Sequence, residues 1–498
     1  MKFKEYKGLD LVATGNEVLD RWKKNHAFEK SLELREGAPE FIFFEGPPSA
    51  NGMPGIHHVM ARSIKDAICR YKTQSGYKVN RRAGWDTHGL PVELGVEKML
   101  GITKEDIGTK ITVEEYNDAC RKEVMKYTAE WVNMTERVGY WVDMNDPYIT
   151  YDNRYIETLW YLLKKIYDKG LLYKGKSIQP YSPAAGTGLS THELNQPGCY
   201  RDVKDTTATA QFAVVRDEKS EFLFAEGVPA YFLAWTTTPW TLPSNTALCV
   251  GPNIDYVRVL SFNPYTGQPA LYVAAEALVG SLFNPKAAAV AFEDYKPGDK
   301  LVPYKVLDGK LKGTDLVGIR YEQLIPWFNP GEGAFKVIPG DYVTTEDGTG
   351  IVHIAPTFGA DDAKVARLAG VPGLQIVDRN GDLQAQVDLR GRFFRVEDLD
   401  PEYAAANMSP EYAEWAGRYV KNAYDAELPA DAPTLDVDIC VMLKQQNKAF
   451  KVEKHTHNYP HCWRTDKPVL YYPLNSWFIK TTAVRERMME LNEQITWK

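Results

Sequence analysis

The sequence lacks long apolar segments and paired cysteines, and both absences narrow the class of protein. No run in its 498 residues reaches the roughly 18 apolar residues of a membrane-spanning helix. The first residues show no apolar stretch followed by a small-residue cleavage site, as a signal peptide would. The six cysteines are scattered, and none forms a Cys-x-x-Cys pair. We therefore expect a cytoplasmic protein with free thiols and no contact with a membrane.

Basic side chains are not in excess either. The 59 Lys and Arg residues are outnumbered by 66 Asp and Glu residues, which gives a formal net charge of −7. This balance argues against a globally basic nucleic-acid coat but allows a local basic patch. With 44% hydrophobic and 25% charged residues the chain is typical of globular proteins, and its length predicts about two to four domains. Composition alone indicates no function.

The first third of the chain has an α/β pattern. The apolar run at residues 41–44, followed by Gly46-Pro47-Pro48, predicts a buried strand and a loop. Apolar stripes at helical spacing predict a helix at residues 56–71, one long helix at 116–134 and a third helix at 159–166. Gly76 and Gly170 follow the first and third helices as stop signals. This order of elements predicts a Rossmann-like, doubly wound parallel sheet.

The pattern changes after about residue 181. Short β-like runs at 207–215, 231–235, 256–261 and 350–354 alternate with turns rich in Gly, Pro and Asp. After the Asp- and Pro-rich stretch at 427–436 the chain again has an α/β pattern. We therefore predict an α/β domain in two parts, residues 1–185 and 431–498, interrupted by a β-rich (α+β) domain at residues 186–430.

The loop before the first predicted long helix carries a candidate phosphate site. Residues 46–58 read Gly-Pro-Pro-Ser-Ala-Asn-Gly-Met-Pro-Gly-Ile-His-His. Unpaired N–H groups and the positive end of the helix dipole attract phosphate at such a helix start. The imidazoles of His57 and His58 can donate hydrogen bonds to phosphate oxygens as charge shifts at the α-phosphorus. A histidine pair by itself is equally typical of capping or packing.

This segment resembles the adenylate-forming signature of class I aminoacyl-tRNA synthetases, His-x-Gly-His after a Gly-Pro-Pro-x-Ala-Asn-Gly loop. Residues 82–93, Arg-Ala-Gly-Trp-Asp-Thr-His-Gly-Leu-Pro-Val-Glu, are similar to the isoleucyl members, whereas leucyl and valyl members usually differ around Thr87 and His88. The resemblance implies a fold with a nucleotide-binding catalytic domain and an inserted editing domain. It also implies three sites in the catalytic domain. The catalytic signature site comprises Gly55, His57 and His58, and the ATP site comprises Gly46, Asn51, Gly52, His57 and His58. The amino-acid site comprises Pro47, Asp86 and Trp477.

One of these assignments also has a physical argument, whereas that of Trp477 rests on the resemblance. Asp86 offers a carboxylate beside a tight loop bounded by Gly84 and Gly89, which suits the ammonium group of an amino acid. A turn or cap aspartate is the structural alternative. Trp477 stands in a segment similar to the strand that lines the amino-acid pocket of the family, and a buried core tryptophan is its alternative.

The chain departs from the family signature at one place. Gly55 stands where the first histidine belongs, and His57 stands where glycine belongs, so the motif is Gly-x-His-His. His58 keeps its place. Because two imidazoles remain within one helical turn, we expect activation activity to be retained. We expect altered binding of compounds that occupy the signature region, because a position normally kept small now carries a ring.

Two further segments, residues 235–245 and 348–362, resemble the editing domain shared by isoleucyl, valyl and leucyl synthetases. The first holds four hydroxyls within six residues, which can position a water molecule or the terminal ribose of tRNA. A Thr-rich strand followed by an Asx turn is the structural alternative. By resemblance the editing site comprises Thr237, Thr238, Thr241, Asn245, His353 and Asp362, with Asp362 holding the ammonium of the misattached amino acid. Such a domain is needed because one methylene discriminates by only about 1–3 kcal/mol, a limit for which this family is the standard example.

Residues 455–464, His-Thr-His-Asn-Tyr-Pro-His-Cys-Trp-Arg, contain residue types that bind zinc. Many relatives have a second cysteine where Thr465 stands, and two more near residues 181–186, where this chain has none. We therefore predict no bound zinc and no other resident metal. A site of three histidines with Cys462 remains the alternative.

The resemblance covers essentially the whole chain but only about the first half of a family member. No Lys-Met-Ser-Lys-Ser-like loop and no anticodon-binding domain is present, so we expect Lys498 to be a fragment boundary and the fragment to aminoacylate poorly. The predicted activity is ATP- and Mg²⁺-dependent activation of L-isoleucine, its ligation to tRNA(Ile), and hydrolysis of misactivated or mischarged valine, by a monomer. The alternatives are a valyl or leucyl synthetase, a stand-alone aminoacyl-tRNA deacylase, and a non-catalytic relic.

Overall fold

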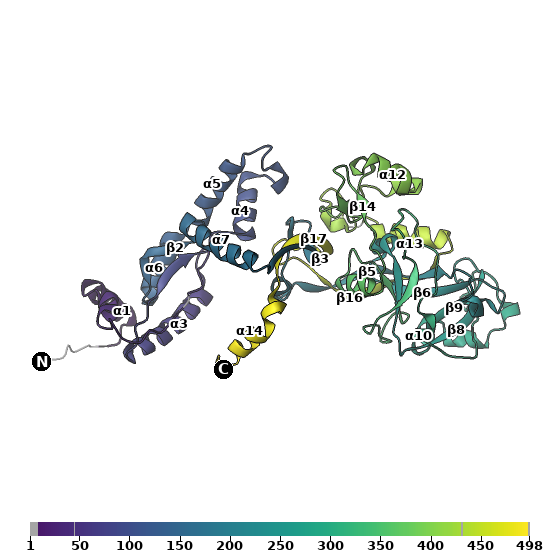
Figure 1. Ribbon diagram of the computed structural model, residues 1–498, viewed down its shortest axis with the longest axis horizontal. Helices are drawn as coiled ribbons and strands as arrows, with labels where there is room; N and C mark the ends of the chain where they lie inside the picture. Colours follow the sequence, from purple (N-terminus) through teal and green to yellow (C-terminus); the bar gives the residue numbers. More distant parts are fainter. Residues whose placement is uncertain (1–7, 44, 430–431, 497–498) are drawn as a thin grey trace. The chain divides into compact units, whose positions relative to one another are not determined.

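The computed structural model describes residues 8–43, 45–429 and 432–496, and the chain falls into two compact units (Figure 1). Unit 1 comprises Met1–Tyr173 and Phe478–Lys498, and unit 2 comprises Lys174–Trp477. The limits of the inserted domain at residues 186 and 430 remain a prediction. No helix in the described part of the chain has the length and apolar character needed to cross a membrane.

Unit 1 is an α/β unit. Its strands β1 (Arg82–Trp85) and β2 (Asp143–Ile149) pair in parallel, with Arg82 opposite Asp143 and Trp85 opposite Ile149. The surrounding helices are α1 (Leu11–Lys24), α2 (Ala27–Glu33), α3 (Ile56–Gln74), α4 (Leu90–Leu100), η1 (Lys104–Asp106), α5 (Val113–Val124), α6 (Thr128–Val138), α7 (Asn153–Asp168), η10 (Thr481–Val484) and α14 (Arg485–Asn492). Gly76 and Gly170 adopt positive φ just beyond α3 and α7, which confirms both predicted stop signals.

The predicted buried strand at residues 41–44 is wrong for the residues that the structure describes, and residue 44 lies outside them. Pairing is limited to one parallel bridge, between Glu40 and Lys78. Phe41 N–H donates to the Lys78 carbonyl at 3.0 Å, but the ladder does not continue. Ile42 is 72% exposed. The apolar run is therefore an extended segment beside β1 rather than a core strand.

The predicted long helix at residues 116–134 is two helices, α5 and α6. The helical path breaks between Val124 and Thr128, where Tyr127 N–H donates to the carbonyl of Ala50 at 3.0 Å. This bond to a distant loop replaces one that would have continued the helix. The apolar stripe crosses the break without interruption, so periodicity alone could not reveal it.

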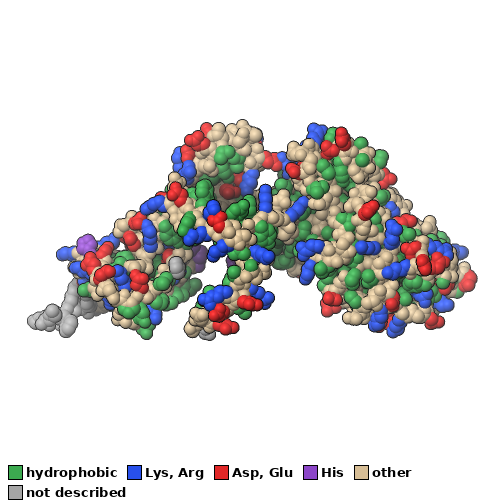
Figure 2. All heavy atoms as spheres, viewed as in Figure 1, with side chains coloured by type: hydrophobic (Ala, Val, Ile, Leu, Met, Phe, Trp, Pro, Cys, Tyr) green, Lys and Arg blue, Asp and Glu red, His purple; other side chains and the backbone are tan. Residues whose placement is uncertain are grey.

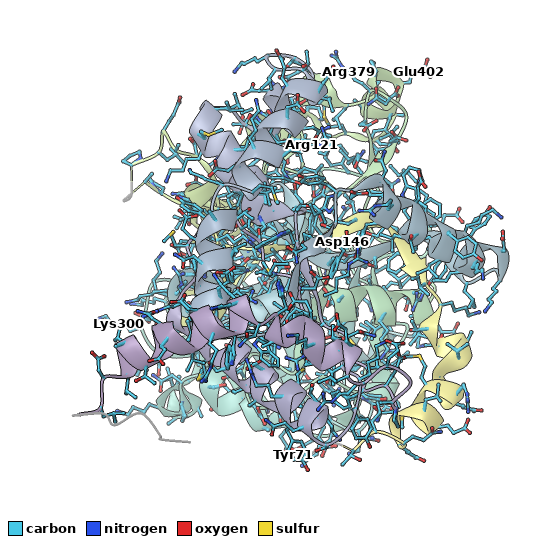
Figure 3. The ribbon with its side chains drawn as sticks, turned by 90° about the vertical axis from the view of Figure 1, so that its left-hand side faces the viewer. Tyr71, Arg121, Asp146, Lys300, Arg379 and Glu402 are labelled. Atoms are coloured by element: carbon cyan, nitrogen blue, oxygen red, sulfur yellow. The ribbon has the colours of Figure 1, made fainter. Side chains whose placement is uncertain are left out.

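The predicted helix at residues 56–71 is confirmed as α3, but its apolar stripe does not face the core of unit 1. Ile56, Met60 and Tyr71 are exposed by 82%, 62% and 66%, and Tyr71 projects from the ribbon at the lower edge of Figure 3. The buried residues of α3 are instead Arg62, Cys69 and Thr73. The guanidinium of Arg62 lies over two rings, those of Trp131 and Tyr140, at 5.4 and 5.6 Å. The polar face of α3 is therefore the buried one, because its charged side chains contact aromatic rings and hydrogen-bonding groups.

Unit 2 is built on a ten-stranded mixed sheet. Its order is β10-β8-β9-β6-β13-β7-β12, with β11 on β8 and with β5 pairing both β6 and β16. The strands are β5 (Tyr200–Ala213), β6 (Ala230–Thr236), β7 (Ala247–Val250), β8 (Asp255–Phe262), β9 (Pro269–Ala275), β10 (Lys305–Val306), β11 (Leu311–Lys312), β12 (Lys336–Pro339), β13 (Ile351–Ile354) and β16 (Ala449–Pro460). The four β-like runs predicted from the sequence fall on β5, β6, β8 and β13, which confirms them.

Shorter elements complete unit 2. Two small sheets consist of β14 (Ile376–Val377) with β15 (Leu383–Gln384), and of β17 (Leu470–Ile479), β3 (Leu172–Ser182) and β4 (Thr187–Gly188). The helices are α8 (Thr191–Leu194), η2 (Glu221–Phe224), η3 (Pro239–Ser244), η4 (Glu276–Leu278), α9 (Val279–Leu282), η5 (Pro285–Ala289), η6 (Phe292–Asp294), α10 (Gly313–Leu316), α11 (Ala360–Leu368), η7 (Val396–Asp398), α12 (Pro401–Asn407), η8 (Pro410–Glu414), η9 (Asn422–Tyr424) and α13 (Leu435–Gln445).

The largest core of the chain lies in unit 2. Phe212 and Phe232, opposite each other on β5 and β6, are fully buried, as are Trp327 and Tyr412. Each such side chain contributes about 1.5–3 kcal/mol by burial. On the face seen in Figure 2 acidic and basic side chains are interspersed, in line with the near balance of charges in the sequence. The core therefore provides a rigid support for the loops at the ends of β6 and β13.

Candidate activation and editing sites

The signature loop leads directly into α3. Gly55 is the residue before the first turn, and its N–H donates to Nδ1 of His58 at 2.9 Å. Because Nδ1 accepts this bond, the ring proton of neutral His58 lies on Nε2. Burial lowers the pKa of His58, and the nearby charges of His57 and Arg62 lower it further. His58 thus presents a neutral N–H donor beside the free N–H groups of the α3 N-terminus.

His57 folds over the glycine that precedes α3. Its ring centroid lies 3.8 Å from that of His58, and a Cβ placed on Gly55 would approach Cε1 of His57 to 2.9 Å. The space required by a side chain at position 55 is therefore taken by the ring at position 57. The exchanged glycine and histidine of the signature are sterically coupled, which the sequence could not show.

The predicted amino-acid anchor lies beside this loop. Asp86 N–H donates to the carbonyl of Pro48 at 3.0 Å, and Trp131 Nε1 donates to the carbonyl of Gly52 at 2.9 Å. Ala50 and Trp85 pack with Trp131 in one buried cluster. The Asp86 side chain is exposed, and its Oδ1 accepts a weak hydrogen bond from His88 N–H at 3.5 Å, so the residue also has the turn role named as its structural alternative. The signature loop and the Asp86 turn therefore converge, as the resemblance implied.

The loop is also held from the other side of β1. A Cβ on Gly84 would lie 2.3 Å from the ring of Tyr148, and the Tyr148 hydroxyl donates to the carbonyl of Glu45 at 3.0 Å. Glycine is required at position 84 because the ring crosses the strand there. Tyr148 has no motif around it, so sequence reasoning missed its role.

Thr87 and His88, the residues that favoured the isoleucyl type, have structural partners. The Thr87 hydroxyl lies 2.8 Å from that of Thr150, and Nδ1 of His88 lies 3.0 Å from the same oxygen. Both side chains therefore brace the turn that carries Asp86. Trp477 belongs to unit 2 and is 62% exposed, so its place against the amino-acid side chain remains a prediction.

The predicted editing residues gather around one cavity of about 380 Å³ in unit 2. It lies where the loops after β6 and β13 adjoin, and these strands pair in parallel through Trp235 and Val352. Its lining includes the predicted residues Thr237, Thr238, Thr241, His353 and Asp362. Asn245 lies behind the wall and contacts His353 through its side-chain amide.

His353 is a buried, orienting residue. Burial lowers its pKa to about 4, so the ring is neutral at physiological pH. Nδ1 lies 3.2 Å from the amide nitrogen of Asn245 and accepts its hydrogen, which leaves Nε2 as the donor to the Thr241 hydroxyl at 2.9 Å. Thr241 in turn donates to the carbonyl of Thr238 at 2.8 Å. This chain of bonds orients the hydroxyls of the Thr-rich segment.

Asp362 projects into the cavity from the first turn of α11. Burial raises the pKa of its carboxyl to about 6, although the group accepts a hydrogen bond from Ala355 N–H at 2.8 Å. A Cβ on Gly359 would lie 2.6 Å from Cγ of Asp362, so glycine makes room for the carboxyl. A cationic ligand would restore the charge on such a carboxyl. Its surroundings suit an ammonium group.

One wall of this cavity consists of residues that no sequence motif indicated. Tyr342 and Phe358 line it, and burial raises the pKa of the neighbouring Cys249 thiol to about 11. Neither aromatic residue carries a local pattern that indicates a site. Only Phe358 stands near a recognised motif, three residues before Asp361-Asp362.

A larger cavity of about 740 Å³ lies on the opposite side of α11. Lys364 and Arg367 line it, whereas Asp362 on the same helix lines the smaller cavity. None of the predicted site residues faces the larger cavity. The smaller one is the better candidate site because the predicted groups converge there.

The histidine-rich segment has other partners. His457 Nε2 lies 3.3 Å from Asp205 Oδ2, and Cys462 is fully buried among apolar residues. In the described part of the chain, three or more His, Cys, Asp or Glu side chains nowhere come together as a metal would require. The absence of a structural zinc remains a prediction.

Comparison with known proteins bears on these sites. The family model of class I tRNA synthetases (I, L, M and V) matches residues 17–498. The chain therefore belongs to the class I tRNA synthetases, which confirms the predicted family and its α/β fold.

Similar curated proteins are isoleucine–tRNA ligases. That of Bacteroides fragilis (strain YCH46) is 67% identical over all of this chain and 43% of its own length, and that of Porphyromonas gingivalis is 65% identical over 44% of its own length. That of Clostridium tetani is 40% identical over 99% of this chain and 41% of its own length. The chain thus spans less than half the length of these relatives.

Among solved structures, the P. knowlesi cytosolic leucyl-tRNA synthetase editing domain matches 51% of this chain and 98% of its own. The identity is 12% and the TM-score is 0.32.

Proposed function

We propose that the protein activates L-isoleucine with ATP and ligates it to tRNA(Ile). The observation that carries the proposal is the bond between Asp86 N–H and the Pro48 carbonyl. This bond, at 3.0 Å, sets an exposed carboxylate beside a loop that ends at the free N–H groups of α3. A site for an ammonium group and a site for phosphate thereby adjoin.

The chemistry is a displacement at phosphorus. The carboxylate of isoleucine attacks the α-phosphorus of ATP, a new P–O bond forms, and pyrophosphate leaves. Asp86 orients the amino acid, and the Nε2–H of His58 with the α3 N-terminus stabilises charge on the phosphate oxygens. Mg²⁺ would arrive bound to the ATP phosphates and offset their charge. No side chain is needed as a nucleophile.

We further propose that the cavity beside the loops that follow β6 and β13 hydrolyses valine attached in error. Asp362 would hold the ammonium group of the valyl ester, and the hydroxyls of Thr237 and Thr238 would orient the ribose and the attacking water. Hydrolysis breaks the ester C–O bond and releases valine and intact tRNA. The neutral ring of His353 is consistent with an orienting role, because a pKa of about 4 makes it a weak base.

Pyrophosphate exchange with isoleucine, valine and leucine, measured on the full-length protein, tests the activation proposal. We expect exchange to be most efficient with isoleucine and to fall at least about 100-fold in Asp86→Ala, because the ammonium loses its counter-charge. Arg82 pairs with the exposed Asp146 at the other end of β1, which makes Asp146→Ala a control. A preference for valine or leucine would indicate another member of the family, and no exchange would favour a deacylase or a non-catalytic protein.

We also propose a cytoplasmic monomer that does not contact membranes. The scattered free thiols, of which Cys120 is partly exposed and the others are buried, are in keeping with a reducing compartment. Light scattering on the full-length protein checks the oligomeric state, and a mass of twice the chain would refute the monomer.

A further inference from the structure

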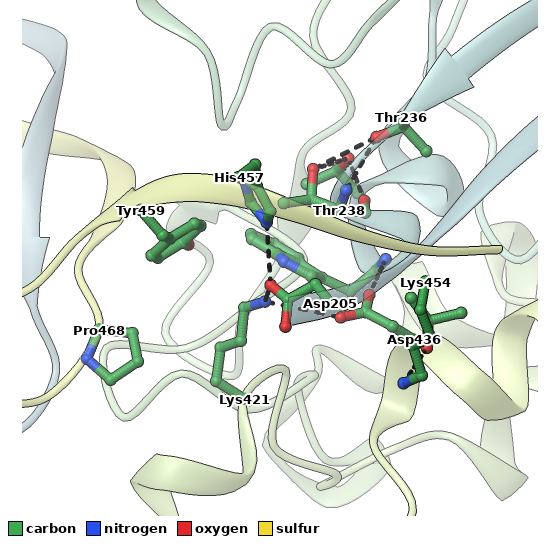
Figure 4. Close-up of polar contacts among 12 residues, drawn as sticks. Asp205, Thr236, Thr238, Lys421, Asp436, Lys454, His457, Tyr459 and Pro468 are labelled. Carbon is green, nitrogen blue, oxygen red and sulfur yellow. Dashed lines mark hydrogen bonds and ion pairs between the residues drawn. The ribbon is translucent and has the colours of Figure 1, made fainter. Parts of the chain in front are cut away.

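A buried charged network lies directly beneath the Thr-rich segment of the editing cavity (Figure 4). Lys421 Nζ lies 2.9 Å from Asp205 Oδ2 and 3.6 Å from Asp436 Oδ2. The Lys421 and Asp436 side chains are only 11% and 3% exposed. His457 contacts the same Asp205 oxygen at 3.3 Å, and the ammonium of Lys421 lies over the ring of Tyr459 at 5.0 Å. The network therefore joins β5, β16 and α13 with the segment around Lys421.

One contact links this network to the editing cavity. Asp436 Oδ1 accepts a hydrogen bond from the backbone N–H of Trp240 at 2.9 Å. Trp240 is the second residue of η3, which begins at Pro239 and carries Thr241. Thr238, the residue before η3, makes no side-chain capping bond. Since Pro239 has no N–H, Trp240 N–H is the first donor of the turn, and a carboxylate 196 positions further along the chain satisfies it.

Ion pairing alone does not explain such a network. Removing the charges of Lys421, Asp205 and Asp436 from water costs desolvation energy. A protein in which apolar residues replace such a buried ion-pair network is often equally stable. Apolar residues, however, could not supply a hydrogen-bond acceptor for Trp240 N–H at a defined place. The position of this N–H governs the turn that follows Thr238 and carries Thr241, and both threonines line the cavity.

We propose that Asp436, held in place by Lys421, is a positioning residue for the editing reaction. It touches no reacting group. It fixes the turn from Thr238 to Thr241 so that the hydroxyls meet the ester and water in a productive arrangement. This inference rests on the proposed editing function of the same cavity.

The test compares Asp436→Ala with Asp438→Ala in the full-length protein. Asp438 lies on the same helix, and it pairs with Arg418 at the surface, where both side chains are 37% exposed. We expect Asp436→Ala to lower kcat for hydrolysis of valyl-tRNA by roughly 10- to 100-fold with KM within about twofold, and Asp438→Ala to leave both unchanged. Pyrophosphate exchange with isoleucine should not change in either variant.

A spectroscopic readout separates positioning from general loss of structure. In protein labelled with ¹⁵N-tryptophan, the Trp240 amide, assigned through Trp240→Phe, should shift and exchange faster with solvent in Asp436→Ala. The other tryptophan amides of unit 2 should remain in place. Asp436→Asn retains an amide oxygen as acceptor and should recover part of kcat and of the exchange protection. If Asp436→Ala does not fold, Asp436→Asn still gives both measurements.

Four outcomes are decisive. Unchanged kcat in Asp436→Ala would overturn the positioning role, as would a lowered kcat with an unchanged Trp240 amide. If Asp362→Ala also hydrolyses valyl-tRNA at the normal rate, the editing proposal itself fails. A slow Asp362→Ala beside a normal Asp436→Ala would refute only the inference about Asp436.

Discussion

Asp362→Asn should make the protein more stable at neutral pH while it abolishes editing. Burial raises the pKa of this carboxyl from 3.8 to about 6. Between these values the folded state binds more protons than the unfolded state, so stability falls as pH rises through this window. The penalty is absent below pH 3.8 and complete above pH 6. Asparagine, which carries no charge, avoids it at every pH.

The size of the effect follows from the shift. A change from 3.8 to about 6 corresponds to about 3 kcal/mol at pH 8, and to roughly half of that at pH 5. Asn retains an oxygen that can accept the bond from Ala355 N–H, so little of this gain should be lost. Because Asp362 is not completely buried, solvent screening makes 3 kcal/mol an upper bound, and we expect about 1–3 kcal/mol.

Urea unfolding of the protein at pH 5 and pH 8, followed by tryptophan fluorescence, measures this gain. Valyl-tRNA hydrolysis by the full-length protein measures the loss of function. Asp361→Asn is the comparison variant, because Asp361 occupies the same turn of α11 but is exposed. Its charge adds to the raised pKa of Asp362 less than burial does, so Asp361→Asn should give a clearly smaller gain than Asp362→Asn. Equal stability of Asp362→Asn and the parent at pH 8, or a gain that does not shrink at pH 5, would refute the electrostatic reasoning.

Further predictions concern the activation site. Gly55→His alone should lower kcat/KM for pyrophosphate exchange roughly 5- to 100-fold, because the displaced His57 ring loses its tilted contact with His58 and its rotamer. Adding His57→Gly should recover most of it, and additive effects of the two changes would contradict the coupling. Inhibitor constants of signature-region compounds, measured on the double variant, should differ from those of the parent. Gly84→Ala should destabilise unit 1 by about 1–3 kcal/mol in thermal unfolding, because its Cβ meets the ring of Tyr148, and Gly84→Ala combined with Tyr148→Ala should restore part of that loss. Trp131→Phe, which removes the bond to the Gly52 carbonyl, should cost about 0.5–1.5 kcal/mol in transition-state binding, and an unchanged kcat/KM would show that the loop holds its place without it.

Local pattern was sufficient for much of the fold. The strands β5, β6, β8 and β13 and the helices α3 and α7 were predicted from side-chain period and glycine stops. The hydrogen bonds of the helices form within the segment, and the apolar residues of the strands must be buried wherever the strands pair. Local pattern failed at residues 41–44 and at the break between α5 and α6, where a distant backbone partner decides the outcome.

The candidate sites likewise have some features that the sequence predicted and others that only the structure showed. The sequence by itself determined which chemical groups are present. The two signature blocks and the two editing segments are each contiguous in the chain, and their residue types are those that the proposed chemistry requires. Only the tertiary structure decided that His57 fills the space above Gly55, that His353 is a neutral donor to Thr241, and that Asp436 serves a turn 196 positions away. The physical reason is that tautomer, pKa and hydrogen-bond partner depend on neighbours in space, and those neighbours are set by packing rather than by order along the chain.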